Sequence, residues 1–170
     1  HYPGSGRWDY DNDLSGLISL CDALLTLKKP IELDMSGCGL SVNGVNPVAK
    51  AISAGAVLTS INCLMNPIGE DGLATLVSAI KDSSVRSICG LTEGQTTADF
   101  SDMGLGPFDC KIMAAEFDFR GAIAALNSLI VDTADTKDGY GDWKYGGPKT
   151  YTLTVDEDKI DLSKKNLSLI

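Results

Sequence analysis

The chain is 170 residues long, 44% of its residues are hydrophobic, and it carries 23 acidic against 14 basic residues, for a net charge of −9. This length and composition suffice for one domain with a sizeable core, while the negative charge argues against binding to a nucleic-acid backbone. The sequence contains no uninterrupted apolar run of the roughly 18 to 20 residues that a membrane-spanning helix needs, so we expect no direct membrane insertion.

The N-terminal segment offers little catalytic chemistry. His1 is the only histidine, so no internal histidine is available as a general base. Because His1 stands where an initiator methionine would, we interpret the chain as a processed product or a fragment. The alternating aspartates at 9–13 open like a calcium-binding loop, but Leu14 and Leu20 occupy the positions of the required glycine and glutamate. We therefore interpret these aspartates as a helix-capping loop.

Four segments with the apolar spacing of one helix face follow along the chain. The first begins at Leu17, and the next three begin 28, 28 and 37 residues further on. Apolar residues with this spacing share one side of a helix, and a recurrence every 20 to 50 residues or so is typical of a repeat array. The predicted helix faces are Leu17, Leu20, Cys21 and Leu24; Val45, Val48, Ala49 and Ile52; Leu73, Leu76, Val77 and Ile80; and Cys110, Met113, Ala114 and Phe117.

Short strand patterns lie between these helices, so helix and strand alternate within one period. The first pattern comprises Pro30, Leu33, Met35, Cys38 and Leu40, and the second comprises Leu58, Ile61, Cys63, Asn66 and Ile68. The second, followed by Gly69 and an apolar helix, resembles the leucine-rich repeat of the ribonuclease-inhibitor type. The resemblance extends from about Asp13 to Val131. It implies an α/β solenoid with parallel strands on a concave face and helices on a convex face. It also implies that the Asn66 and Cys38 side chains satisfy backbone groups of the loops that leave the strands.

The third unit departs from the regular spacing. A strand pattern over 85–90 is followed by a second one that begins at Gln95, only 10 residues after the first began at Val85. We predict an extra strand or hairpin around Gly94. A fourth strand, Ile123 to Val131, restores the spacing before the pattern ends. We therefore divide the chain into a repeat array with an N-terminal cap over 1–131, and an irregular linker, β-hairpin and terminal strand cap over 132–170.

Both tryptophans lie in related pentapeptides near the two ends of the chain, at 6–10 and 141–145, which suggests a larger duplicated block. The alternating residues 149–155 predict a strand, and we expect a hairpin over 143–155. Residues 159–170 form either another strand, which we favour, or the start of a helix. The aromatic residues Trp143, Tyr145 and Tyr151 either cover the end of the array or form a docking surface.

None of the five cysteines has the close spacing of a zinc or redox motif. Cys21 and Cys110 fall on helix faces, Cys63 on the strand core and Cys38 in the loop position, so we expect these four to be buried. Cys89 falls on the open strand face and is the candidate reactive thiol. Reduced thiols favour a reducing intracellular compartment, either the cytoplasm or an organelle interior.

The strand face opposite the core is the predicted binding surface. Because strand side chains alternate, stacked strands would expose an apolar column rimmed by polar residues, as a protein-binding surface requires. The alternative is that the leucines are covered by the C-terminal segment or are isolated exposed residues. The predicted column is Leu64, Leu91 and Leu129, beside the polar residues Asp34, Asn62, Cys89, Asp99 and Asn127.

These patterns favour a non-catalytic protein–protein interaction module that binds a protein partner through its concave strand face. The alternative is a structural accessory subunit, permanently embedded in a larger assembly through its helices and aromatic termini. We predict no catalytic residue, cofactor or metal-ligand set.

Overall fold

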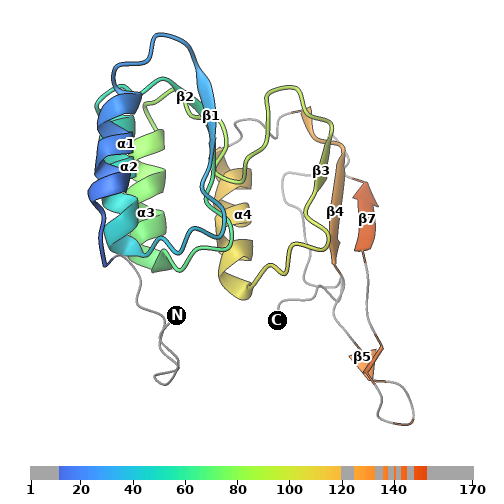
Figure 1. The fold of residues 1–170 in the computed structure, drawn as a ribbon. Helices are drawn as coiled ribbons and strands as arrows, with labels where there is room; N and C mark the ends of the chain where they lie inside the picture. The colour runs from blue at the N-terminus through green and yellow to red at the C-terminus, as the bar shows by residue number, and fades with distance from the viewer. Residues whose placement is uncertain are drawn as a thin grey trace.

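The computed structural model describes residues 12–119, 125–132, 136–137, 140, 143–144 and 148–152 (Figure 1). Helix and strand alternate along the chain as far as the strand that follows the fourth helix. The helices are α1 (Ser15–Leu24), α2 (Val42–Ser53), α3 (Gly69–Ile80) and α4 (Pro107–Phe119). The strands are β1 (Ile31–Asp34), β2 (Leu58–Asn62), β3 (Thr97–Asp99), β4 (Ser128–Asp132), β5 (Thr136–Lys137), β6 (Trp143–Lys144) and β7 (Pro148–Thr152).

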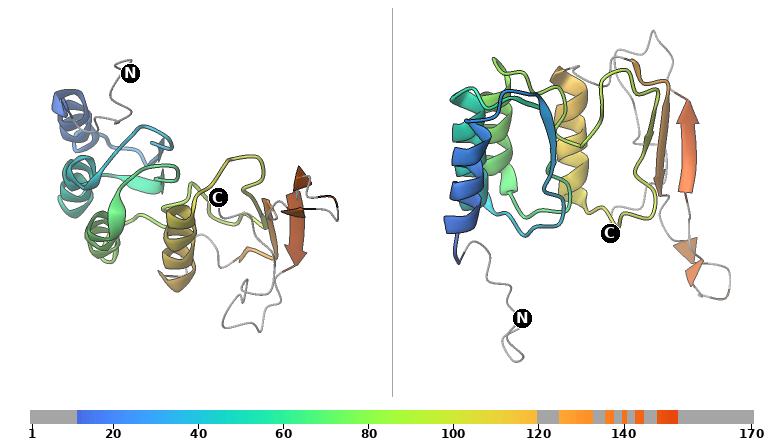
Figure 2. Two further views of the ribbon diagram at one scale, coloured as in Figure 1. Left: turned by 90° about the horizontal axis from the view of Figure 1, so that it is seen from below. Right: turned by 45° about the horizontal axis from the view of Figure 1, so that its top comes forward.

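The four helices form a curved row, β1 and β2 lie along the inner side of this row, and β4 and β7 lie beyond α4 (Figure 2). The strands β1 and β2 pair in parallel, and so do β3 and β4. The strand β7 adds to the second sheet antiparallel to β4, and β5 pairs antiparallel with β6. The described part of the chain is thus an α/β structure with short parallel strand pairs.

The core follows the predicted apolar pattern most closely in α2 and α3. All four predicted residues of α2 are buried, and Leu76 and Ile80 of α3 are buried as well. All of these residues except Ala49 pack with Leu58 and Ile61 of β2 in one cluster. In α1 only Cys21 and Leu24 are buried, and Leu20 is exposed. No described helix lies on the side of α1 that is turned away from α2.

In α4 the buried face is shifted by one residue from the prediction. The predicted Cys110 is half-buried and Ala114 is exposed. The buried residues are instead Asp109, Ile112, Met113 and Glu116. The two carboxylates on this face accept hydrogen bonds from backbone N–H groups of two earlier segments, at Met65 and at Ile88 and Cys89, which an apolar pattern could not reveal.

One turn recurs after three strands. The side chains of Asp34, Asn62 and Asp99 each accept the backbone N–H of the residue two positions later. Three residues after each of them the backbone has a positive φ, at Gly37 (62°), Met65 (59°) and Asp102 (56°). The spacing of these turns, 28 and then 37 residues, equals the spacing of the predicted helix faces. The apolar recurrence in the sequence therefore coincides with a recurrence of backbone conformation.

The irregular third unit is where the chain passes from one sheet to the other. Residues 85–90 add to the first sheet, since Ile61 N–H donates to Ser87 O at 2.9 Å and Cys63 N–H to Ile88 O at 2.9 Å. A turn over 92–95 leads into β3, which pairs with β4 of the second sheet. The extra strand-like segment is present, but the predicted hairpin is wrong because the two segments join different sheets.

The C-terminal strands also differ from the prediction. Within the part of the chain that is described, β6 pairs with β5 and β7 pairs with β4, so 143–155 do not form one hairpin. The alternating segment at 149–155 does lie in a strand as far as Thr152. The predicted terminal segment 159–170 lies outside the described residues.

Candidate interaction surface

The open face of the first sheet brings together two predicted binding residues, Asp34 and Asn62, which are register partners in β1 and β2. Asp34 is exposed and its Oδ1 accepts the Ser36 N–H at 2.9 Å. This backbone bond and the Ser36 hydroxyl lower the pKa of Asp34, so its charge persists at neutral pH. Asn62 is half-buried and packs against Gly90, where a Cβ would stand 3.0 Å from the Asn62 Cβ. Exposed Glu32 completes an acidic strip along β1.

The other polar residues of the predicted column lie in the second sheet. Asp99 in β3 accepts the Ser101 hydroxyl at 2.6 Å and the Ser101 N–H at 3.0 Å, and these two bonds lower its pKa. Exposed Asn127 precedes β4, and its N–H donates to Thr96 O at 2.9 Å. The predicted polar column is therefore divided between two sheets.

The predicted apolar column is wrong, because Leu64, Leu91 and Leu129 are all buried. The strand β2 ends at Asn62 and the chain turns at Leu64 and Met65, so strand alternation does not extend to Leu64. In β4, Val131 is buried as its pattern position predicts, but Leu129 faces the core in place of the predicted Ser128, one position out of register. A shift of one residue moves every side chain of a strand to the opposite face.

The prediction for the cysteines is also partly wrong. Cys89 is buried instead of exposed, and this burial, with the nearby Glu116 charge, raises its pKa far above the usual thiol range. Cys63 is buried as expected, and desolvation raises its pKa to about 12. Cys21 is buried as well. Cys38, predicted to be buried, is the exposed thiol. The structure therefore removes Cys89 as a reactive candidate.

The three aromatic candidates belong to the C-terminal part of the chain, of which the structure describes only short strands. Tyr145 lies outside the described residues, and for Trp143 in β6 and Tyr151 in β7 only the strand pairing is described. Their docking role stays a prediction.

Two buried carboxylates that the sequence patterns missed tie α4 to the first sheet. Glu116 Oε2 accepts the N–H groups of Ile88 at 2.6 Å and Cys89 at 3.2 Å. Seven residues earlier on the helix, Asp109 Oδ1 accepts the Met65 N–H at 2.6 Å. Desolvation raises the pKa of Glu116 although these backbone donors lower it in part. The sequence did contain one indication of these carboxylates. Asp109 and Glu116 are seven residues apart, so they lie on the same helix face as the apolar residues Ile112 and Met113.

Asn66 forms a third buried polar centre, and it has the role that was expected for it. Its Oδ1 accepts the Leu40 N–H at 2.9 Å, and its Nδ2 donates to Met35 O at 2.7 Å and to Cys63 O at 3.2 Å. One side chain thus joins the loops of two successive units.

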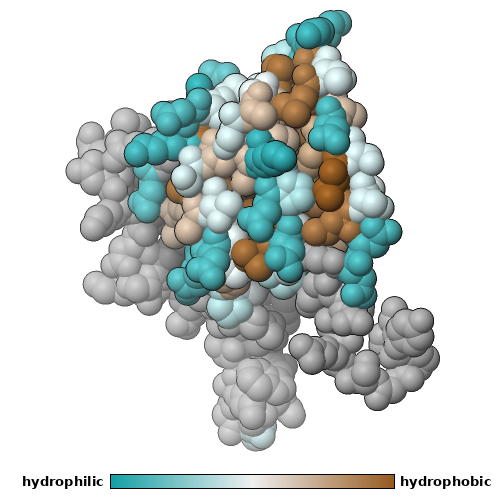
Figure 3. Space-filling view, turned by 90° about the vertical axis from the view of Figure 1, so that its left-hand side faces the viewer, coloured by the Kyte–Doolittle hydropathy of each residue, from teal (hydrophilic) through white to brown (hydrophobic). Residues whose placement is uncertain are grey.

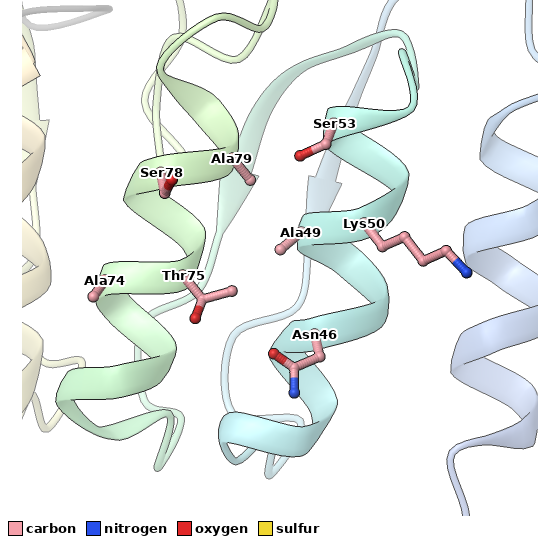
Figure 4. A pocket seen from close by; sticks show the side chains of 8 residues that line it. All are labelled: Asn46, Ala49, Lys50, Ser53, Ala74, Thr75, Ser78 and Ala79. Carbon is pink, nitrogen blue, oxygen red and sulfur yellow. The ribbon is translucent and has the colours of Figure 1, made fainter.

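The outer side of the molecule is formed by helices, with apolar patches between polar ones (Figure 3). A shallow groove runs between α2 and α3, and Lys50 extends from it toward α1 (Figure 4). Small and uncharged side chains make up the rest of its lining, namely Asn46, Ala49, Ser53, Ala74, Thr75, Ser78 and Ala79. This groove has no concentration of charge that would select a ligand.

Across the described ranges, no three histidine, cysteine or acidic side chains are grouped so that they could hold a metal ion. Among the same residues, no helix has both the length and the apolar content to cross a membrane. No protein-family model matches the chain, and no curated protein sequence matches it either.

Proposed function

We propose that this chain is a non-catalytic protein-interaction module of the leucine-rich-repeat solenoid type, and that it binds a protein partner through the open face of its first sheet. The observation that carries the proposal is the acidic strip of Glu32 and Asp34 beside Asn62, on strands held by buried loops. The turns after these strands are fixed by Asn66, so the strip is presented by a rigid scaffold.

The chemistry of this strip selects a basic partner. Asp34 stays ionised because Ser36 donates to it, and the chain as a whole has a net charge of −9. Complementary charge accelerates association and suppresses wrong partners more than it adds affinity. The partner surface is therefore expected to carry lysine or arginine residues, and binding is expected to weaken as the salt concentration rises.

The test is affinity isolation from native extract with quantitative mass spectrometry. We expect the double variant Glu32→Lys with Asp34→Lys to lose a partner that the wild type retains. The matched control is Asp71→Lys with Asp82→Lys, which makes the same charge change at exposed positions at the start and just after the end of α3. Equal retention of every partner by wild type, double variant and control would contradict the proposal.

The second candidate is a structural accessory subunit that is permanently embedded in a larger assembly. The observation that favours it is the set of large apolar side chains exposed on α1 and just after it, Ile18, Leu20, Leu25 and Leu27. Size exclusion of native lysate separates the two candidates. A reversible module elutes partly as free chain, whereas a structural subunit elutes only with the large assembly.

A further inference from the structure

One side of α3 packs against the helix of the preceding unit. A Cβ placed on Gly72 would stand 3.5 Å from the Val42 Cα and 3.7 Å from the Val45 Cγ2, both in α2. Ala79 points toward α2 as well (Figure 4). Leu76 lies between these two residues on the same face, because residues four and seven apart share one side of a helix, and it is 0% exposed. A glycine, a leucine and an alanine thus form the contact with the preceding unit.

The same three residue types recur on α1, where they are exposed. The residues 56 positions earlier are Gly16, Leu20 and Ala23. Leu20 is 41% exposed, and a Cβ placed on Gly16 would meet no described atom within 4 Å. The equivalent residues of α2 are all buried, namely Gly44, Val48 and Ala51. The helix α1 therefore has the composition of a helix contact on a side that no described element covers.

The loop and the strand of the first unit are open in the same direction. Asn66 reaches back into the preceding unit, where it accepts the Leu40 N–H at 2.9 Å and donates to Met35 O at 2.7 Å. Cys38 holds the equivalent position 28 residues earlier, but it is exposed. Among the described residues β1 pairs only with β2, so its other edge has no neighbouring strand. We call the exposed set Gly16, Leu20, Ala23 and Cys38 the end surface.

The equivalent side of α3 shows what such a surface accepts. It is covered by a helix that brings Val42 and Val45 close, and the glycine lets the two backbones approach because it has no side chain. The residues that lead into α1 do not supply a unit of this kind. Ser5 and Arg7 stand 28 residues before the apolar strand positions of the first pattern. The matching unit must therefore come from another chain.

We propose that the end surface binds an α/β repeat unit of another protein, which stacks on α1 as α1 stacks on α2. The helix of this unit covers Gly16, Leu20 and Ala23 with β-branched and small side chains, its strand pairs in parallel with the open edge of β1, and its loop buries Cys38. The contact joins two different surfaces and continues the array, so it is heterologous. It is independent of the partner-binding function, since it uses the end of the array and not the open face of the first sheet.

The first test extends the full chain by one unit. Residues 14–41 are duplicated ahead of Leu14, with Cys38→Ser in the added copy, and alkylation of the original Cys38 is followed by peptide mass spectrometry. We expect the original Cys38 to react at least about tenfold more slowly than in the unextended chain, because a buried thiol is inert. Leu20→Lys in the original unit should restore the fast reaction. Equal rates in the extended and unextended chains would overturn the proposal.

The matched control is Ile18→Lys in the original unit. It adds the same charge to another residue of α1, which is 46% exposed but lies on a different side of the helix from Leu20. This variant should retain the protection of Cys38, and circular dichroism verifies that both variants remain folded. Loss of protection in both variants alike would also contradict a contact through the end surface.

Cross-linking in native extract identifies the natural occupant. Lys28 and Lys29 follow α1 and are exposed, so a lysine-reactive reagent can link them to a protein on the end surface. We expect links to a different protein, in a segment with alternating helix and strand repeats, which are lost in Leu20→Lys and kept in Ile18→Lys. The proposal is overturned by links only between copies of this chain, by links only to a protein without such repeats, or by the absence of any link that depends on Leu20. The double variant Glu32→Lys with Asp34→Lys should keep these links, which separates this outcome from the partner-binding test.

Discussion

Two regions of the molecule are buried by different chemistry. The first sheet packs against its three helices through apolar side chains, whereas α4 joins the first sheet through buried carboxylates, at what we call the α4 junction. Between α2, α3 and β2 the contact is made by interlocking apolar side chains such as Val48, Leu76 and Ile61. At the junction, α4 buries the carboxylates of Asp109 and Glu116 against backbone N–H groups. Regular spacing lets apolar faces meet, whereas the inserted segment 85–90 leaves backbone donors that a side-chain acceptor must satisfy.

The largest effect on the free energy of unfolding is expected in the apolar contact between α2, α3 and β2. Replacement of Leu76 by alanine removes a fully buried side chain from the centre of α3 and is expected to lower the free energy of unfolding by about 3 kcal/mol. Urea unfolding measures the loss. The half-buried Leu73 on the same helix is the control, and Leu73→Ala should cost clearly less. Equal costs at the two positions would mean that α3 is not packed as described.

At the junction, Glu116→Ala leaves the N–H groups of Ile88 and Cys89 without their acceptor. We expect a loss of about 2 kcal/mol, because an unsatisfied buried donor costs its desolvation energy. Glu116→Gln retains one carbonyl oxygen as acceptor and should lose less. The exposed acid on the same helix, Asp118, is the control, and its replacement by alanine should change stability by no more than about 0.5 kcal/mol.

The dependence of stability on pH separates the buried acid from the exposed ones. Burial raises the pKa of Glu116 in the folded state above its ordinary value of 4.5. Its contribution to stability is therefore fully present below 4.5 and is lost as the pH rises through the folded pKa. Wild type should gain stability relative to Glu116→Gln as the pH falls from neutral toward 4.5. The lowered pKa values of Asp34 and Asp99 act in the opposite direction, but they are common to both proteins and cancel in this difference.

The smallest effect is expected for the exposed ion pair between Lys111 of α4 and Glu70 of α3. Both side chains are largely in solvent, so Lys111→Ala should change the unfolding free energy by less than about 1 kcal/mol. Thermal unfolding at low and high salt measures it. A larger loss would show that the surface, and not the buried carboxylates, holds α4 in place.

The sequence predicted the apolar contacts between helices and strands better than the contact between α4 and the first sheet. The apolar spacing located the helices, and the loop position of Asn66 anticipated its buried hydrogen bonds. The prediction failed where a buried acid replaced an apolar residue, as at Glu116, and where a strand ended early, as before Leu64. Sequence periodicity records which positions are apolar, and it contains no signal for a carboxylate whose burial is balanced by backbone donors.

The exposed binding residues were predicted less well than the core. Asp34 and Asn62 were correctly placed side by side, since both lie in strands of regular spacing. Leu91, which lies within the irregular third unit, and Leu129, which follows it, were misplaced because the register could not be extrapolated there. The exposed apolar side of α1 could be found only by comparing the burial of equivalent positions.

The most direct test of this account is amide hydrogen exchange at Ile88 and Cys89, measured residue by residue in the wild type and in Glu116→Ala, which removes the acceptor of both N–H groups. The account predicts slow exchange at both amides in the wild type, comparable with Ile61 in β2, and selectively faster exchange at these two amides in the variant. Unchanged exchange at Ile88 and Cys89, or faster exchange spread evenly over β2 and α3, would contradict the claim that the Glu116 carboxylate holds the junction between the two sheets.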